Sequence, residues 1–283
     1  MPLSERLDLL SAQAAVGGVA GVMPSGRTAS ILGTAVNEVD YATTVNQLCR
    51  WAETGQSRYV CFLTVHMVME GFDDPAFQSI VNAADLVAPD GMPIMMTSRL
   101  MGLGAQTRVT GPKTLGRLCA EAAVRGLPVG FYGSTPAVLD SIKRNLAQHH
   151  PNLKVAYAHS PPFRALSEDE KAAVVEEINA SGAKLIFVGL GCPKQERWMS
   201  EMRGKVRAVM LGVGFAFDLH SGVAEFAPEW MQTLSLEWLY RLFKDPKRLW
   251  KRYLTTNPRY LYFLSGQMLG LRKYRTDPAV RRP

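Results

Sequence analysis

Residues 183–198, AKLIFVGLGCPKQERW, contain the pattern that decides the fold. An apolar run ends in Gly189 and Gly191, and Pro193 then stands where a helix can begin. An apolar run without alternation is typical of a strand that is buried on both faces of a parallel sheet. The stretch therefore predicts a strand, a tight turn and a helix.

Similar apolar runs recur along the chain and alternate with segments of helical periodicity. The other runs span residues 31–36, 58–65, 127–134, 153–159 and 207–214. Between them, the helix expected from about 167 to 181 opens with Ser167 and Glu170 at capping-box spacing. This alternation predicts an α/β, Rossmann-like fold, with a mostly parallel sheet covered by helices on both faces.

Composition describes an ordinary globular protein. The chain has 283 residues, of which 47% are hydrophobic, which is ample for a buried core. Its four cysteines are far apart, so neither a disulfide framework nor a zinc site is expected, and a reducing compartment fits best. No window approaches the roughly 18 apolar residues of a membrane-spanning helix. We expect a chain that does not span a membrane.

Charge is concentrated near the C-terminus. Residues 230–275 contain ten Lys or Arg and two acidic residues, whereas the whole chain has a formal charge of +7. This asymmetry indicates a polyanionic partner or an anionic membrane surface. The expected organisation is a flexible N-terminal extension (1–28), an α/β catalytic core (29–228), a basic amphipathic helical appendage (229–275) and a tail (276–283).

The appendage is expected to contain an amphipathic helix. Asp245 can cap this helix and Pro246 can open it. At 100° per residue, basic and apolar side chains fall on opposite faces. The basic face holds Lys247, Arg248, Lys251 and Arg252, and the apolar face holds Leu249, Trp250, Tyr253 and Leu254.

Ligands of open α/β sheets bind beyond the carboxyl ends of the strands, and one candidate site follows residue 188. Backbone N–H groups near Gly189 and Gly191 could bind phosphate, Lys194 adds charge, and Gln195 could bind a sugar or base. The alternative is a plain strand-to-helix turn. The lone GxG slightly favours that alternative.

A second candidate is RVTGPKT, residues 108–114. Arg108 can contact phosphate through two N–H groups, Thr110 offers a hydroxyl, and Gly111 opens a helix. The alternative is a capped helix with an exposed arginine. A third candidate, LGVGFAFDLHSG at residues 211–222, places Gly214 and Asp218 at a strand end, with a pocket and a capped turn about equally favoured.

The stretch ADLVAPDGMPI, residues 83–93, ends an apolar run in an acid. Asp90 stands between Pro89, which cannot donate a hydrogen bond, and Gly91, which tolerates unusual backbone angles. A fixed, tight turn is therefore expected. The residues alone favour a capping aspartate over a working group.

Several enzyme classes lose their main support. The sequence has no GxGxxG after the first strand, no GxxxxGK[ST], no HExxH and no GxSxG. No DxD pair at a strand end is available to hold Mg²⁺. We therefore expect no cofactor and no metal, and a bound nucleotide sugar would need cationic side chains and backbone donors at its leaving diphosphate.

Five separated motifs together resemble the WecG/TagA/CpsF glycosyltransferase family (glycosyltransferase family 26), from about residue 31 to residue 264. They are ADLVAPDGMP, RVTGPKT, VGLGCPKQERWM, GVGFAFDLHSG and LEWLYRLFKDPKRLWKRYL. The resemblance implies an inverting, metal-independent bacterial enzyme. Such an enzyme moves a sugar from a UDP donor to a lipid-diphosphate-linked sugar in cell-envelope polysaccharide or exopolysaccharide synthesis.

The resemblance also implies roles for individual residues. Asp90 matches the proposed general base, Arg108 suits the donor diphosphate, and Gln195 suits donor or acceptor hydroxyls. Many relatives carry Thr-x-Asn where this chain has Phe62 and Thr64. Thr64 can still bind a sugar but Phe62 cannot, which leaves the donor sugar open.

Two further assignments follow from the resemblance. His66 could replace the missing polar group, with a satisfied strand-end histidine at least as favoured. The appendage would bind the acceptor diphosphate and anionic lipid, which implies a cytoplasmic protein, peripheral at the inner face of the cell membrane, with homo-oligomers holding the appendage away. Its candidates are Arg241, Arg248, Lys251 and Arg252.

Two other functions remain open from the sequence. A nucleic-acid-binding protein could use the basic tail, where Trp238, Trp250, Tyr253 and Tyr260 could stack on bases. That hypothesis leaves the strand-end motifs unexplained. A nucleotide-sugar-binding regulator without catalysis is the second alternative, and Phe62 is the departure that favours it.

Overall fold

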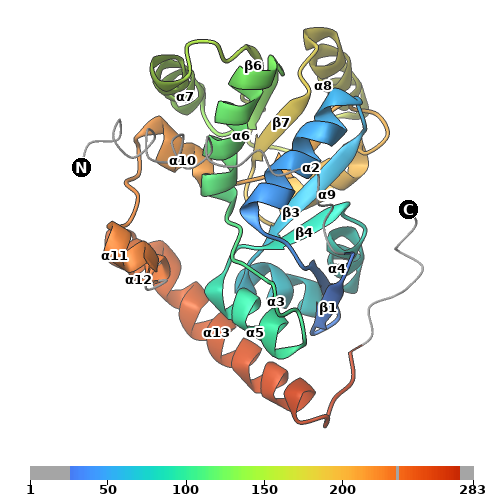
Figure 1. Cartoon of the computed structure of the whole chain (residues 1–283), viewed down its shortest axis with the longest axis vertical. Coiled ribbons are helices and arrows are strands. Elements are labelled where there is room, and N and C mark those ends of the chain that lie inside the picture. Colours follow the sequence, from blue (N-terminus) through green and yellow to red (C-terminus); the bar gives the residue numbers. More distant parts are fainter. Residues whose placement is uncertain (1–25, 234–235, 275–283) are drawn as a thin grey trace.

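The computed structural model describes residues 26–233 and 236–274 as a parallel sheet covered by helices on both faces (Figure 1). In the described ranges, six strands pair in the order β4-β3-β8-β7-β5-β6, each pair parallel. They are β3 (Arg58–Leu63), β4 (Leu86–Pro89), β5 (Val129–Gly133), β6 (Val155–His159), β7 (Leu185–Gly189) and β8 (Val209–Gly212). The α/β prediction is confirmed. Most of the expected extension (1–28) and all of the tail (276–283) lie outside the described residues.

Helices connect the strands and also form the C-terminal part. Those of the core are α2 (Tyr41–Glu53), α3 (Val65–Asp73), α4 (Pro75–Asn82), α5 (Met92–Leu100), α6 (Gly111–Arg125), α7 (Pro136–His149), α8 (Glu168–Ser181), α9 (Lys194–Met202) and α10 (Ala216–Ser221). The C-terminal part contains α11 (Glu229–Thr233), α12 (Glu237–Lys244) and α13 (Pro246–Met268). The predicted capping box of α8 is present.

Two buried clusters, one on each face of the sheet, explain the continuous apolar runs. In β3, Val60 and Phe62 pack with side chains of α2 and α6, whereas Tyr59 and Cys61 pack with side chains of α3 and α4. Successive side chains of a strand point to opposite faces, so a strand covered on both sides needs apolar residues throughout.

The first expected strand, 31–36, is instead a hairpin. β1 (Thr28–Ile31) and β2 (Thr34–Asn37) form a separate two-stranded antiparallel sheet. The turn places Leu32 at φ 50° and Gly33 at φ 87°. Two positive φ values are typical of a two-residue hairpin turn, but a leucine rarely adopts one. The apolar run therefore concealed the turn.

The C-terminal helix α13 packs along the core beside α3 and α5 (Figure 1). Tyr260 is fully buried there, and its hydroxyl lies 3.0 Å from the Thr97 hydroxyl of α5. Near the end of α13, the Gln267 side chain accepts the Leu32 N–H at 2.9 Å and donates to the Ser30 carbonyl at 2.8 Å. The end of the appendage is thus tied to the N-terminal hairpin.

The start of α13 differs in two ways from expectation. The helix begins at Pro246 as predicted, but the Asp245 side chain makes no cap hydrogen bond. Leu249 is buried, whereas Trp250 and Leu254 of the expected apolar face are 52% and 66% exposed. A helical wheel predicts which side chains share a face, but it does not predict whether another part of the chain covers that face. Among the described helices, none is both long and apolar enough to cross a membrane.

Candidate active site

Asp90 follows β4 at the carboxyl edge of the sheet. Its backbone N–H donates to the Leu63 carbonyl of β3 at 3.0 Å, and its Oδ2 accepts the Gly111 N–H at 3.0 Å. The carboxylate therefore sits at the N-terminus of α6, where the helix dipole favours negative charge. Gly91 has an ordinary φ of −78°, so the turn does not use the freedom of a glycine there. The turn is fixed by hydrogen bonds instead, because the Gly91 N–H also donates to the Leu63 carbonyl, at 3.3 Å, and both bonds anchor the turn to β3.

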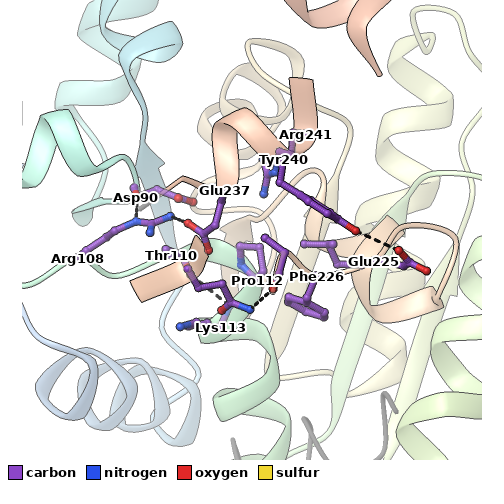
Figure 2. A pocket seen from close by; sticks show the side chains of 13 residues that line it. Asp90, Arg108, Thr110, Pro112, Lys113, Glu225, Phe226, Glu237, Tyr240 and Arg241 are labelled. Carbon is purple, nitrogen blue, oxygen red and sulfur yellow. Dashed lines mark hydrogen bonds and ion pairs between the residues drawn. The ribbon is translucent and has the colours of Figure 1, made fainter. Parts of the chain in front are cut away.

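Arg108 lies beside Asp90 because the segment before α6 runs along the end of β4. The Val109 N–H donates to the Pro89 carbonyl at 2.9 Å, and the Arg108 Nε donates to the Asp90 carbonyl at 2.5 Å. The Arg108 Nη2 pairs with the Glu237 carboxylate of α12. Figure 2 shows the arginine between these two acids. The motifs ADLVAPDGMPI (83–93) and RVTGPKT (108–114) thus meet at one place.

A pocket opens beside these residues (Figure 2). Helix α12 and the loop that follows α10 cover the N-terminus of α6. The free volume is about 30 Å³, which holds one or two water molecules rather than a ligand of ordinary size. The lining residues are Asp90, Arg108, Thr110, Pro112, Lys113, Leu219, Glu225, Phe226, Ala227, Gln232, Glu237, Tyr240 and Arg241.

Burial and charge shift two pKa values in the pocket. Burial raises the pKa of the Asp90 carboxyl above its ordinary value, while Arg108, the Gly111 N–H and Arg241 oppose the rise. Burial lowers the pKa of the Lys113 ammonium, and the Glu237 carboxylate opposes that change. A partly desolvated carboxylate beside cationic side chains can accept a proton next to a bound anion.

Thr110 lines the pocket and also caps α6. Its hydroxyl accepts the Lys113 N–H at 3.4 Å. The Tyr41 hydroxyl accepts the Thr110 N–H at 3.0 Å and lies 3.1 Å from the Thr110 Oγ1. Tyr41 in turn packs under Arg117, whose guanidinium carbon is 4.2 Å from the ring centroid. This network fixes the start of α6, and with it the N–H that holds Asp90.

Gln195 and the glycine turn lie outside the pocket lining. Gln195 is buried, and its Nε2 donates to the Gly212 carbonyl at 3.0 Å and to the Glu196 Oε1 at 2.7 Å. Its Oε1 accepts the Gly191 N–H at 3.2 Å. Both ends of the amide are therefore used within the protein. Gln195 ties the turn after β7 to the end of β8, which lies behind α6.

The other residues of this motif and of the third motif are placed separately. Lys194 is exposed at the start of α9, and Gly189 packs against the Phe217 ring. Gly214 lies against the Gln195 side chain. The Asp218 carbonyl accepts the Ala224 N–H at 2.9 Å. None of these four predicted residues lines the pocket.

The predicted residues at the end of β3 and just after it also lie outside the pocket lining. Thr64 caps α3 and accepts the Met67 N–H at 3.3 Å. The His66 Nδ1 is 3.6 Å from the Glu70 carboxylate. Phe62 is buried in the core, with its ring against Gly111. Phe62 therefore acts here as a packing residue under α6 rather than as a pocket wall.

Of the predicted appendage cations whose side chains the structure describes, Arg241 and Lys251, only Arg241 lines the pocket. The Arg241 guanidinium carbon is 4.5 Å from the centroid of the Phe215 ring. Lys251 is exposed. The side chains of Arg248 and Arg252 lie outside the part of the chain that the structure describes.

The sequence analysis missed several pocket residues. Lys113 stood inside the quoted RVTGPKT motif, and Glu237 is one of only two acids among the basic residues of 230–275, so both carried a signal. Tyr240 and Glu225, joined by a 3.0 Å hydrogen bond, carried none. Within the described residues, no group of three or more His, Cys, Asp or Glu side chains is arranged to hold a metal.

Comparison with known proteins gives the family. The chain matches the model described as "Glycosyl transferase WecG/TagA/CpsF family" over residues 29–274. It is similar to two proteins named N-acetylglucosaminyldiphosphoundecaprenol N-acetyl-beta-D-mannosaminyltransferase. The one from Bacillus subtilis is 31% identical over 188 residues, which cover 66% of this chain and 71% of the relative. The one from Bacillus spizizenii is 31% identical over 193 residues, which cover 68% and 72%. The chain therefore belongs to the WecG/TagA/CpsF family of glycosyltransferases.

Proposed function

We propose that this glycosyltransferase moves a sugar from a UDP-sugar to a polyprenyl-diphosphate-linked sugar, with inversion and without a metal. The observation that carries the proposal is that Asp90, Arg108 and Arg241 line one pocket at the carboxyl edge of the sheet. The names of the two relatives describe a sugar acceptor on a polyprenyl diphosphate. Such an acceptor belongs to the assembly of cell-surface polysaccharide.

Asp90 serves as the general base in the proposed reaction. Its carboxylate takes the proton from the acceptor hydroxyl as that oxygen attacks the anomeric carbon, and UDP leaves from the opposite face. Burial raises the pKa of Asp90, which strengthens it as a base. The Gly111 N–H keeps the carboxylate in place.

Arg108 and Arg241 stabilise the charge that develops on the leaving diphosphate. Guanidinium groups hold phosphate oxygens through paired N–H donors, and they are more effective in a pocket with little water. The two guanidinium groups come from different parts of the chain. They line one pocket because α12 lies over the core. The cationic pair fills the role that a divalent metal has in other nucleotide-sugar enzymes.

The appendage is proposed to bind an anionic membrane surface. Trp250 and Leu254 are exposed on α13 beside the exposed Lys251, a combination typical of helices that lie in a lipid interface. Leu254→Glu should reduce association with vesicles that contain phosphatidylglycerol. Val124→Glu, at an exposed apolar residue of α6, is the matched control. Equal binding by both variants would contradict the surface.

The nucleic-acid alternative loses one of its supports. Of the four tail aromatic residues expected to stack on bases, Tyr260 is buried against α5 and is inaccessible to a nucleotide.

The test is transfer from a panel of UDP-sugars to a short-chain lipid-diphosphate sugar, followed by mass spectrometry. Asp90→Asn should lose at least about 100-fold in turnover, since general-base catalysis contributes 10²–10⁴-fold. Asp140→Asn, an exposed carboxylate of α7, is the matched control. The anomeric configuration of the product tests inversion, and retained activity in EDTA tests metal independence. Near-wild-type turnover by Asp90→Asn would remove the proposed base.

A further inference from the structure

A carboxylate side chain of the protein itself occupies part of the pocket. Three cationic and three acidic side chains line it, so their formal charges cancel. One of the acids, Glu237, belongs to the first turn of α12 rather than to the core. Its carboxylate pairs with the Arg108 guanidinium, as Figure 2 shows.

Glu237 lines the pocket together with a second cation, Lys113. This lysine is half-buried in the first turn of α6, and the Glu237 carboxylate is the largest of the charge effects on it. Arg108 and Glu237 are only 20% and 21% exposed. An ammonium and a guanidinium line one pocket, and the guanidinium is already paired with a carboxylate, so the pocket has the groups of an anion-binding site whose place is taken by Glu237.

The geometry points to one site with two states: Lys113 and Arg108 together bind the diphosphate of a nucleotide ligand, and Glu237 takes the place of that diphosphate when no ligand is bound. The inference rests on the proposed UDP-sugar donor and adds to it a second phosphate-binding residue and an internal competitor. The free volume of about 30 Å³ favours an exchange, because the Glu237 carboxylate occupies the Arg108 guanidinium that would otherwise bind the diphosphate.

The exchange separates Glu237 from Arg108 and so loosens the first turn of α12, whereas Arg241, one turn further along the helix, can stay over the pocket. Two further contacts hold that helix, from the Tyr240 hydroxyl and the Lys244 Nζ to the Glu225 carboxylate at 3.0 and 3.1 Å. Glu225 belongs to the loop after α10, and Figure 2 shows it on the other side of Tyr240 from Arg108 and Lys113. Loosening the helix and removing the competing anion can therefore be separated by substitution.

Calorimetric titration with UDP, inorganic pyrophosphate and uridine tests the inference. Glu237→Gln should tighten UDP and pyrophosphate about tenfold, and Lys113→Met should weaken them about tenfold, since each alters a charge-assisted contact. Glu225→Gln removes the same charge from the same pocket and should change either affinity less than about threefold. Uridine, which lacks phosphate, should respond to none of the three.

Two results would overturn the inference: unchanged pyrophosphate affinity in Lys113→Met, or equal tightening by Glu237→Gln and Glu225→Gln. Amide hydrogen exchange without ligand adds a second measurement, in which α12 should exchange faster in Glu237→Gln than in the wild type. Pyrophosphate binding that follows the expected order in a chain that transfers no sugar would support the inference while refuting the proposed function. Sugar transfer by the wild type, together with unchanged UDP and pyrophosphate affinities in Lys113→Met and Glu237→Gln, would support the proposed function while refuting the inference.

Discussion

Replacing Glu196 by Gln should change how the stability of the fold depends on pH. Glu196 is fully buried in α9, and burial raises the pKa of its carboxyl from 4.5 to about 7. Between these values the folded chain keeps a proton that the unfolded chain has lost. The free energy of unfolding of the wild type therefore falls, through this group, as the pH rises from 4.5 to 7.

The size of the effect follows from the two pKa values. Their difference of about 2.5 corresponds to about 3 kcal/mol, at ~1.36 kcal/mol per pKa unit. His220 acts in the opposite direction, because burial lowers its pKa to about 4 and stability through it rises with pH. Because the two effects oppose each other, the pH dependence of the wild-type unfolding free energy alone does not reveal either of them. The difference between variant and wild type isolates Glu196.

Urea unfolding between pH 4.5 and 8 measures this difference. Glu196→Gln has no carboxyl proton to lose. The unfolding free energy of the variant minus that of the wild type should therefore increase by about 3 kcal/mol from pH 4.5 upward and level off once the pH passes 7. Glu201→Gln, at a more exposed position of the same helix, is the control. A difference that varies by less than about 0.5 kcal/mol from pH 4.5 to 8 would refute the reasoning.

Three further outcomes are expected. Tyr260→Phe should cost about 1 kcal/mol of unfolding free energy in urea, since it removes one buried hydrogen bond, and no loss would mean that the hydroxyl contributes nothing. Gly189→Ala should cost about 1–3 kcal/mol, because its Cβ would lie 2.6 Å from the Phe217 ring; a thermal melt checks it. The activity kcat/KM should fall at low pH with an apparent pKa above the ordinary carboxyl value of 3.8, because burial raises the pKa of Asp90. Arg108→Gln should raise that apparent pKa further, and a lower apparent pKa would contradict the assigned charge effect.

The fold and half of the site could be predicted from the sequence because both depend on local pattern and on one general rule. Continuous apolar runs identify strands buried on both faces, and parallel strands bring their carboxyl ends to one edge. That rule places Asp90 at the edge, whereas Arg108 follows no strand and lies beside Asp90 because the segment before α6 runs along the end of β4. The hairpin turn was missed because Leu32 adopts a positive φ without the Asn-Gly pair that usually announces one.

The rest of the site depends on information that a single sequence does not hold. Gln195 has the groups to bind a sugar, but the same groups bond to the Gly212 carbonyl and Gly191 N–H once the turn folds back. Glu237 reaches Arg108 across 129 residues of chain, and no local pattern encodes where the appendage docks. Residue type indicates what a side chain can do, whereas tertiary contacts decide which of its capacities are already used.

The bonds from Gln267 to the hairpin join residues 235 and 237 positions apart. A polypeptide made from its N-terminus cannot form them until nearly the entire described chain has been synthesised. The Leu32 N–H therefore has this partner only after the whole sheet has been translated, although the Leu32 carbonyl can accept the Gln78 Nε2 of α4 much earlier. The hairpin can thus pack on α4 early, but two of its native hydrogen bonds form only near the end of synthesis, and a nascent chain stalled before Gln267 would leave that corner incomplete.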